Sequence, residues 1–238
     1  MKTYKILLVL IALMGYLGGG CEKDITTEGR SKITYYVTFD IEGLNDYGET
    51  LVELGSSYSD PGYTAMEGET DVTSEVTVSG SVDPNTIGAY HISYSAENSD
   101  GYAASASRTV IVYDPDAPAY DLTGAWSGTV IRNNQTGPFN TTISIRTVAN
   151  GFYYISDWLA GFYDQGYGYG SVYTGPGYFT INSNNEIGFV EGVVAPSAWG
   201  YPVDEVRNGI YDPATQTIEQ QIVWLGGAYI FDETLTKQ

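Results

Sequence analysis

The sequence predicts an all-β protein made of two consecutive domains. From Ile33 onward, no stretch repeats apolar residues at the three- to four-residue spacing of an amphipathic helix. Short runs of Val, Ile, Thr and Tyr alternate instead with clusters of Gly, Asp, Asn and Pro, a pattern typical of β-sandwiches and β-barrels. The 206 residues from Ile33 to Gln238 exceed one small sandwich and suit two domains.

A segment rich in proline and aspartate, from Asp114 to Pro118, marks the joint between the domains, because proline ends strands and stiffens linkers. We expect a first domain at 33–114, a linker at 115–121 and a second domain at 122–238. Composition changes there: residues 33–121 hold 16 acidic residues and one basic residue, whereas 122–238 hold ten acidic residues, four basic residues and all four tryptophans. The two domains are therefore not repeats of each other.

The first 32 residues have the pattern of an export segment. Two lysines precede an apolar run from Ile6 to Leu17, which three glycines separate from Cys21. Twelve apolar residues are too few to cross a bilayer, which needs about 20, but they fit a secretory signal. We expect a signal peptide at 1–20 and an anchor linker at 21–32. Cys21 is the only cysteine, so an internal disulfide is excluded.

The Gly18-Gly19-Gly20-Cys21 segment resembles the cleavage site of a bacterial lipoprotein signal. That resemblance implies that Cys21 carries a lipid anchor, through which alone the protein contacts a membrane. Glu22-Lys23-Asp24 resembles the short signal that exports lipoproteins to the cell surface in Bacteroidota. The resemblance therefore implies attachment to the outer membrane, facing the cell exterior.

In the first domain, the alternating pattern predicts short β-strands with turns at Asp60-Pro61-Gly62 and Asp100-Gly101. Tyr90 and Tyr94 stand four apart in one expected strand, so both face the interior. The expected strands are Thr34–Phe39, Thr50–Leu54, Val76–Ser79, Tyr90–Ala96 and Ala104–Val112.

Several motifs in this domain resemble the bacterial surface immunoglobulin-like domain, a relative of hyalin-repeat modules. They are Val52 to Gly62, Asp71 to Ser74, Gly88 to Tyr94, Asp100-Gly101 and Arg108 to Val110, in the order found in that family. The resemblance implies that the first domain is an immunoglobulin-like sandwich and acts as a spacer or adhesion-type module.

The second domain opens with Gly124-Ala125-Trp126, which resembles the first strand of lipocalin-like domains. Turns are expected at Ala149-Asn150-Gly151 and Ser183-Asn184-Asn185. The expected strands are Ala125–Arg132, Asn140–Val148, Phe152–Asp157, Gly170–Thr174, Tyr178–Ile181, Ile187–Val190, Asn208–Tyr211, Thr217–Trp224 and Tyr229–Leu235. Such a series suits a lipocalin-like antiparallel barrel, with an open sandwich as the alternative.

Charge and residue types narrow the possible functions. The chain has a net charge of −19, so nucleic acid is not expected as a partner. His91 is the only histidine and Cys21 is expected to be acylated, which excludes Ser-His and Cys-His sites and leaves too few ligands for zinc. We expect no cofactor and no metal site; an acidic calcium linker at Asp114 and Asp116 is the weaker alternative to a rigid proline linker.

Paired carboxylates could still serve a carbohydrate hydrolase. The candidates in the second domain are Asp157, Asp164, Glu186, Glu191, Asp204, Glu205 and Asp212. The sequence gives no spacing between these groups, and acidic loops are ordinarily solvated. We therefore expect no catalytic residues.

The most informative segment is the run of aromatic residues and glycines from Phe152 to Phe179. Glycine this dense weakens strands, so we expect a loop between Leu159 and Gly168 that presents flat rings with polar tips. A second aromatic loop, Trp199 to Pro202, is expected to close the same opening, whereas Trp126 and Trp224 are expected in the core. The candidate ligand-binding residues are Trp158, Tyr163, Asp164, Gln165, Tyr167, Tyr169, Trp199 and Tyr201.

These features resemble the accessory lipoproteins of Bacteroidota nutrient-uptake loci. The resemblance implies a non-catalytic surface lipoprotein that binds a small molecule or glycan and works beside an outer-membrane transporter. A structural or adhesion lipoprotein with a protein partner is the alternative, and a carbohydrate hydrolase is the third.

Overall fold

The structure confirms the predicted all-β class. The computed structural model describes residues 32–190 and 198–238, and its strands form sheets of three, eight and four strands. The predicted anchor Cys21, the acidic signal after it and Glu191 lie outside the described residues. The segment Tyr36–Gln238 forms one compact unit, which contains both β domains.

The first domain is built from two sheets with the order β1-β3-β4 and β2-β7-β6-β5. Its core holds Tyr94, Val110 and Val112, all of them fully buried. The strands are β1 Val37–Ile41, β2 Glu49–Glu53, β3 Tyr63–Glu67, β4 Thr70–Asp71, β5 Thr77–Ser79, β6 Gly88–Glu97 and β7 Ala103–Tyr113, with a 3-10 turn η1 at Thr73–Glu75. β2 pairs parallel with β7, and the other pairings in the domain are antiparallel.

The turns expected from the sequence are present in the first domain. Gly101 takes a φ of +81° between β6 and β7, a conformation that favours glycine. The Asp60 carboxylate accepts a hydrogen bond from the Gly62 amide at 2.9 Å, which forms the expected turn. Tyr94 is fully buried, and Tyr90 packs against the same core while its hydroxyl donates to the Thr86 carbonyl at 2.8 Å.

Two strands of the first domain were not expected from the sequence, namely β3 and β4. In β3 only Ala65 is fully buried, so the strand lacks the alternation of large apolar residues that the prediction relied on. The two residues of β4 are both exposed. Backbone pairing with β1 holds β3 and pairing with β3 holds β4, while Ala65 and Tyr63 of β3 pack against the core of the domain.

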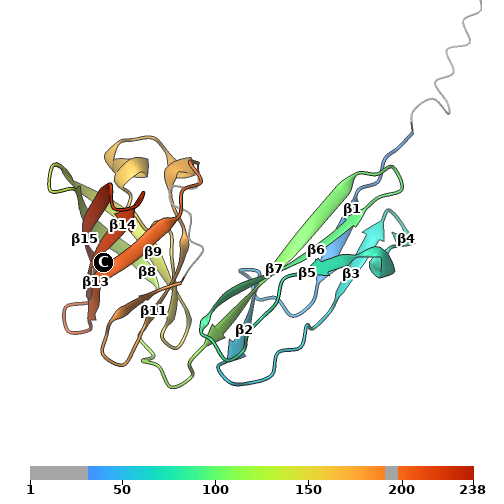
Figure 1. The fold of residues 1–238 in the computed structure, drawn as a ribbon, viewed down its shortest axis with the longest axis horizontal. Helices are drawn as coiled ribbons and strands as arrows, with labels where there is room; N and C mark the ends of the chain where they lie inside the picture. Colours follow the sequence, from blue (N-terminus) through green and yellow to red (C-terminus); the bar gives the residue numbers. More distant parts are fainter. Residues whose placement is uncertain (1–31, 191–197) are drawn as a thin grey trace, which may run out of the picture. The chain divides into compact units, whose positions relative to one another are not determined.

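The second domain is an eight-stranded antiparallel sheet that curls into a nearly closed barrel (Figure 1). The strand order is β12-β11-β10-β9-β8-β15-β14-β13. The strands are β8 Gly124–Arg132, β9 Thr136–Ala149, β10 Phe152–Ile155, β11 Gly177–Ile181, β12 Ile187–Phe189, β13 Val203–Asp212, β14 Thr217–Trp224 and β15 Tyr229–Lys237. Of the two predicted architectures, the structure therefore shows the barrel.

The first and last strands of this sheet, β12 and β13, meet at a narrow seam. An isolated bridge links Glu186 with Ile210, and the Tyr211 amide donates to the Asn185 carbonyl at 2.9 Å. The side chain of Asn185 also accepts a hydrogen bond from the Tyr120 hydroxyl at 2.8 Å. The seam therefore closes the barrel with far fewer backbone hydrogen bonds than the full ladders between the other strands.

The barrel interior is packed with side chains that alternate along the strands. On β14, Ile218, Ile222 and Trp224 are buried and point inward with Gln220. Trp126 is fully buried, and its indole N–H donates to the Leu122 carbonyl at 2.9 Å. The predictions that Trp126 and Trp224 belong to the core are confirmed.

One expected strand of the second domain is wrong. The segment Gly170–Thr174 contains a single 3-10 turn, η3 at Ser171–Tyr173, instead of a strand. Gly170 has a φ of +95°, which breaks an extended chain, and the Thr174 hydroxyl donates back to the Ser171 carbonyl at 2.9 Å. The alternation of Val and Tyr there is too short to outweigh these local turn contacts.

Candidate functional site

A buried carboxylate organises the glycine-rich loop that follows β10. Asp157 accepts hydrogen bonds from the amides of Leu159 at 3.0 Å, Gly161 at 2.9 Å and Gly175 at 2.9 Å. These contacts tie both ends of the loop to one side chain. Burial raises the pKa of Asp157 to about 6, although the three amide donors favour its charged form.

The loop continues as a single π-helical turn, η2, at Phe162–Gly166. Gly161 precedes it with a φ of +74°, and the first two residues of the turn, Phe162 and Tyr163, are buried. Gln165 fastens the turn to β9, because its amide accepts from the Thr142 N–H at 2.8 Å and donates to the Thr142 carbonyl at 2.7 Å. The loop is thus an ordered structure with an irregular backbone, as the glycine content predicted.

Five aromatic side chains from two segments gather above this loop, and we call them the aromatic rim. They are Tyr167, Tyr169, Tyr173, Trp199 and Tyr201. Four of the five have 39–49% of their surface exposed, and Tyr173 is partly buried. The described residue before Trp199, Ala198, donates its amide to the Val172 carbonyl at 3.1 Å, which joins the two segments.

The rim rests on buried rings of the barrel. The Trp199 ring stacks on Trp224, with 6.0 Å between centroids and 17° between planes. It also meets the edge of Tyr163 at 4.8 Å. The Tyr169 ring lies nearly parallel to that of Tyr163 at 6.3 Å, and the Tyr201 ring meets Trp224 at 5.9 Å. Exposed rings that are backed by buried rings lose little conformational entropy when they contact a ligand.

The structure brings together five of the predicted site residues, namely Tyr163, Tyr167, Tyr169, Trp199 and Tyr201. Trp158 instead lies in the core with none of its surface exposed, and its ring meets the edges of Phe179 and Phe189. Trp158 is therefore unavailable to a ligand, because the tight turn held by Asp157 directs it into the barrel.

The two predicted polar residues of the loop already have partners within the chain. Gln165 binds the Thr142 backbone as described, and it also lies 3.4 Å from the Asp164 carboxylate as a donor. Asp164 is partly buried, and its backbone carbonyl accepts from the Gly170 amide at 3.3 Å. Both residues shape the loop that carries the rim.

Sequence reasoning missed one residue of this region, Arg132, at the end of β8. Its guanidinium donates to the Tyr163 hydroxyl at 3.0 Å and to the Tyr167 hydroxyl at 3.4 Å. It also lies 4.7 Å from the centroid of the Tyr229 ring and 5.1 Å from that of Phe162. The scarcity of basic residues in the second domain was the only sequence signal that singled it out.

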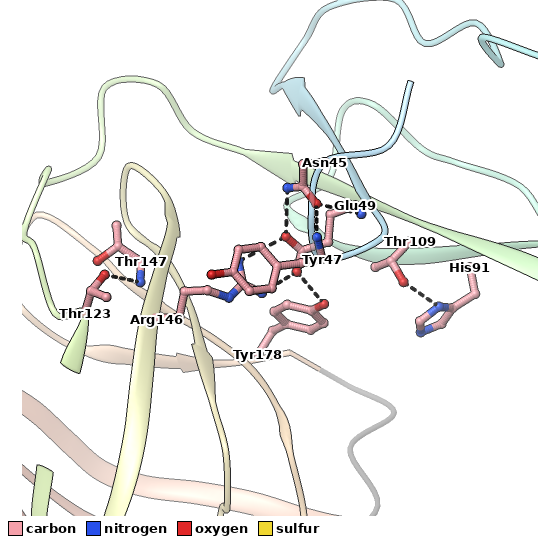
Figure 2. A network of polar contacts seen from close by, with 9 residues as sticks. All are labelled: Asn45, Tyr47, Glu49, His91, Thr109, Thr123, Arg146, Thr147 and Tyr178. Carbon is pink, nitrogen blue, oxygen red and sulfur yellow. Dashed lines mark hydrogen bonds and ion pairs between the residues drawn. The ribbon is translucent and has the colours of Figure 1, made fainter. Parts of the chain in front are cut away.

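A second feature is a pocket of about 510 Å³ around an ion pair (Figure 2). Its lining residues are Tyr47, Glu49, Thr123, Gly124, Ser144, Ile145, Arg146, Tyr154 and Tyr178. Arg146 binds Glu49 with both terminal nitrogens, at 2.6 and 3.1 Å, and its guanidinium lies 3.8 Å from the centroid of the Tyr47 ring.

The Glu49 carboxylate has further donors in the same network. It accepts from the Tyr178 hydroxyl at 2.8 Å and from the Asn45 amide at 3.2 Å. Burial alone would raise the pKa of Glu49, but the hydrogen bonds from Arg146, Asn45 and Tyr178 outweigh it and hold the pKa below its usual value. Both charges are satisfied, so this network is a structural contact between residues of the two domains.

The lone histidine makes one local contact. The His91 ring nitrogen Nδ1 lies 3.3 Å from the Thr109 hydroxyl, across the β6–β7 pair (Figure 2). Among residues 32–190 and 198–238, no group of three or more His, Cys, Asp or Glu residues gathers closely enough to hold a metal ion. The same residues contain no helix with the length and apolar character needed to cross a membrane.

Two family models match this chain. A family model for the Ig-like domain of bacterial surface proteins matches residues 39–112, and a model described as a C-terminal domain matches residues 114–237. The crystal structure of the lipoprotein BT2262 from Bacteroides thetaiotaomicron is 34% identical. That match covers 84% of this chain and 100% of that one, with a TM-score of 0.46.

A further solved structure holds CBM51-2 in complex with GlcNAc and INT domains from Clostridium perfringens ZmpB. It is 20% identical over 50% of this chain and 28% of that one, with a TM-score of 0.28. The curated proteins include no match to this chain. The match to the C-terminal domain covers just over half of the chain, and BT2262 is covered in full. The chain therefore belongs to the family defined by this C-terminal domain, here preceded by a bacterial surface Ig-like domain, and is a relative of a Bacteroides lipoprotein.

Proposed function

We propose that the protein is a lipid-anchored lipoprotein of the outer membrane that faces the cell exterior and binds a glycan through its aromatic rim. The relationship to a Bacteroides lipoprotein and the Ig-like domain of surface proteins support the location. The apolar run before Cys21 supports the lipid anchor. The partner that receives the glycan would be an outer-membrane transporter.

The observation that carries the binding proposal is the rim itself. Four rings with 39–49% exposure stand together on a barrel whose other large aromatic residues are mostly buried. Flat aromatic faces with hydroxyl or indole edges match a sugar ring, which has apolar C–H faces and polar edges. An exposed cluster of this kind is unusual on the surface of a soluble protein and points to a binding site.

Removal of single rim rings should weaken glycan binding. After a glycan array has identified a bound oligosaccharide, Tyr169→Ala and Trp199→Ala are each expected to raise the dissociation constant about tenfold, measured by isothermal titration calorimetry. Tyr102→Ala is the matched control, since Tyr102 is 52% exposed on the first domain. Unchanged affinity in both rim variants, or no glycan bound below millimolar concentration, would count against the proposal.

The location is tested separately from binding. Cys21→Ser is expected to abolish metabolic labelling with a fatty acid and to move the protein from the membrane fraction to the soluble fraction. Protease added to intact cells should degrade the wild-type protein if it faces outward. Retention of Cys21→Ser in the membrane fraction would contradict the lipid anchor, and protection from protease would place the protein inside the envelope.

A further inference from the structure

The arginines of this protein differ in how their charge is balanced. Arg108 pairs with Asp60 at 3.1 Å, Arg146 with Glu49 at 2.6 Å and Arg207 with Glu205 at 2.7 Å. In the part of the chain that the structure describes, Arg132 has no carboxylate within ion-pair distance. This is notable in a chain with 29 acidic and only ten basic residues, where an acidic partner is easily supplied.

The groups that hold Arg132 are neutral. Its hydrogen-bond acceptors are the phenol oxygens of Tyr163 and Tyr167, and aromatic rings lie beside its guanidinium. Burial raises the pKa of Tyr163, so that phenol stays protonated at physiological pH. Such contacts fix the orientation of the planar guanidinium, but they leave its positive charge uncompensated.

The position of Arg132 connects that charge to the rim. Tyr167, which accepts one of its hydrogen bonds, is 39% exposed and lies 5.4 Å from Tyr169 between ring centroids. Arg132 itself is partly exposed. Two of its five N–H groups bind the phenols, and the other three have no hydrogen-bond acceptor among the described residues, so they can donate to a ligand oxygen.

We propose that the glycan bound at the rim is acidic and that Arg132 binds its carboxylate, as in a sugar chain that contains uronic acid. This inference rests on the proposed function and adds the ligand's charge to it. A guanidinium and a carboxylate form two parallel charge-assisted hydrogen bonds, a geometry that a neutral hydroxyl cannot match. The protein's own negative charge does not prevent this, because repulsion is screened beyond about 8 Å at physiological ionic strength, whereas the Arg132 contact is direct.

The test compares two ligands that differ only in charge: tetragalacturonate and its fully methyl-esterified form, measured by calorimetry at 0.15 M salt. Wild type is expected to bind the charged form at least about tenfold more tightly. Arg132→Gln should lose that preference and Arg132→Lys should keep part of it. Arg207→Gln, which removes an exposed arginine already paired with Glu205, should retain it fully. If the role of Arg132 is purely structural, Arg132→Gln should weaken the binding of both ligands equally.

The outcomes separate the two proposals. Equal binding of both ligands by wild type, or an unchanged preference in Arg132→Gln, overturns the acidic-ligand inference and leaves glycan binding standing. Tight binding of a sulfated galactan oligosaccharide, with no binding of tetragalacturonate, overturns the proposal that Arg132 binds a carboxylate. It would show that Arg132 binds a sulfate group instead. Failure of every sugar to bind removes both proposals. The unfolding midpoint of each variant, followed by circular dichroism, checks that the fold is retained.

Discussion

Arg108→Ala is expected to lower the free energy of unfolding of the first domain by about 3–5 kcal/mol, a large part of the stability of a small domain. Arg108 is fully buried and pairs with Asp60 at 3.1 Å. It also donates to the Gly62 carbonyl at 3.0 Å and to the Tyr94 hydroxyl at 3.2 Å. Its removal leaves these acceptors without their donor and opens a cavity.

The same cluster explains why the loss should be large. The Tyr94 hydroxyl donates to the second oxygen of Asp60, so three side chains form one closed network. Burial, together with this hydrogen bond to Asp60, raises the pKa of Tyr94 to about 12. Tyr94 has no exposed surface, so water cannot replace the lost guanidinium there.

Urea unfolding measures this prediction, and the four tryptophans make it selective because all of them lie in the second domain. Far-ultraviolet circular dichroism should show early loss of part of the strand signal, while the tryptophan transition stays near that of wild type. Arg207→Ala is the control: that pair is 46% and 52% exposed, and its loss is expected to cost less than about 1 kcal/mol. A change below about 1 kcal/mol in Arg108→Ala would show that the network is dispensable.

Glu233→Gln is expected to stabilise the barrel at neutral pH. Glu233 is 3% exposed, and it accepts a hydrogen bond from the Gln220 amide at 3.0 Å. Its other carboxyl oxygen has no partner among the described residues. Burial raises the pKa of Glu233 well above its usual value, and the nearby Asp157 charge raises it further.

The sign of the pH dependence follows from these raised pKa values. The folded protein holds protons on Glu233 and Asp157 more tightly than the unfolded chain does, so the contribution of these two groups to stability is greatest at acidic pH. This contribution should fall as the pH rises from about 4, where the unfolded carboxyls ionise, through about 6, the raised pKa of Asp157. Ionisation of Asp157 alone then lowers the free energy of unfolding by about 3 kcal/mol at pH 8 relative to acidic pH, since each pKa unit corresponds to 1.36 kcal/mol.

Thermal or urea unfolding at pH 4 and pH 8 tests this prediction. Glu233→Gln should be more stable than wild type at pH 8 and nearly equal to it at pH 4, because glutamine keeps the shape without the ionisable proton. Asp157→Asn should instead destabilise at both pH values, since Asp157 accepts from three backbone amides. Glu219→Gln, at an exposed position on the same β14 strand, serves as the neutral control. Equal stability of Glu233→Gln and wild type at pH 8 would contradict a buried, protonation-sensitive Glu233.

The sequence was sufficient to predict the all-β class and most strands, because alternation and turn residues are local signals. The prediction failed where the local pattern was weak or where contacts between distant residues determined the structure. β3 buries only Ala65 completely, and the segment after Gly170 forms a 3-10 turn through hydrogen bonds within the segment. The barrel closure could not be read from any one strand, since it depends on β12 meeting β13 from distant parts of the chain.

The candidate site was predictable in its aromatic part and not in its charged part. Dense glycine and tyrosine indicated an irregular loop with exposed rings, and Tyr167 and Tyr169 are indeed exposed. Trp158 was misplaced because sequence spacing does not reveal that Asp157 directs the chain inward. Arg132 ends a regular strand 31 residues before Tyr163, and only the folded barrel brings the two together.

The seam between β12 and β13 gives the barrel a preferred direction of opening. Amide protons along these strands have few interstrand partners at the seam, so they should exchange with solvent through small local fluctuations, well before those of β8 and β9. Tyr120, just before the barrel, holds the seam through Asn185. Loss of this hydrogen bond would therefore widen the seam, and the cylinder would open at its edge strands before its central strands separate.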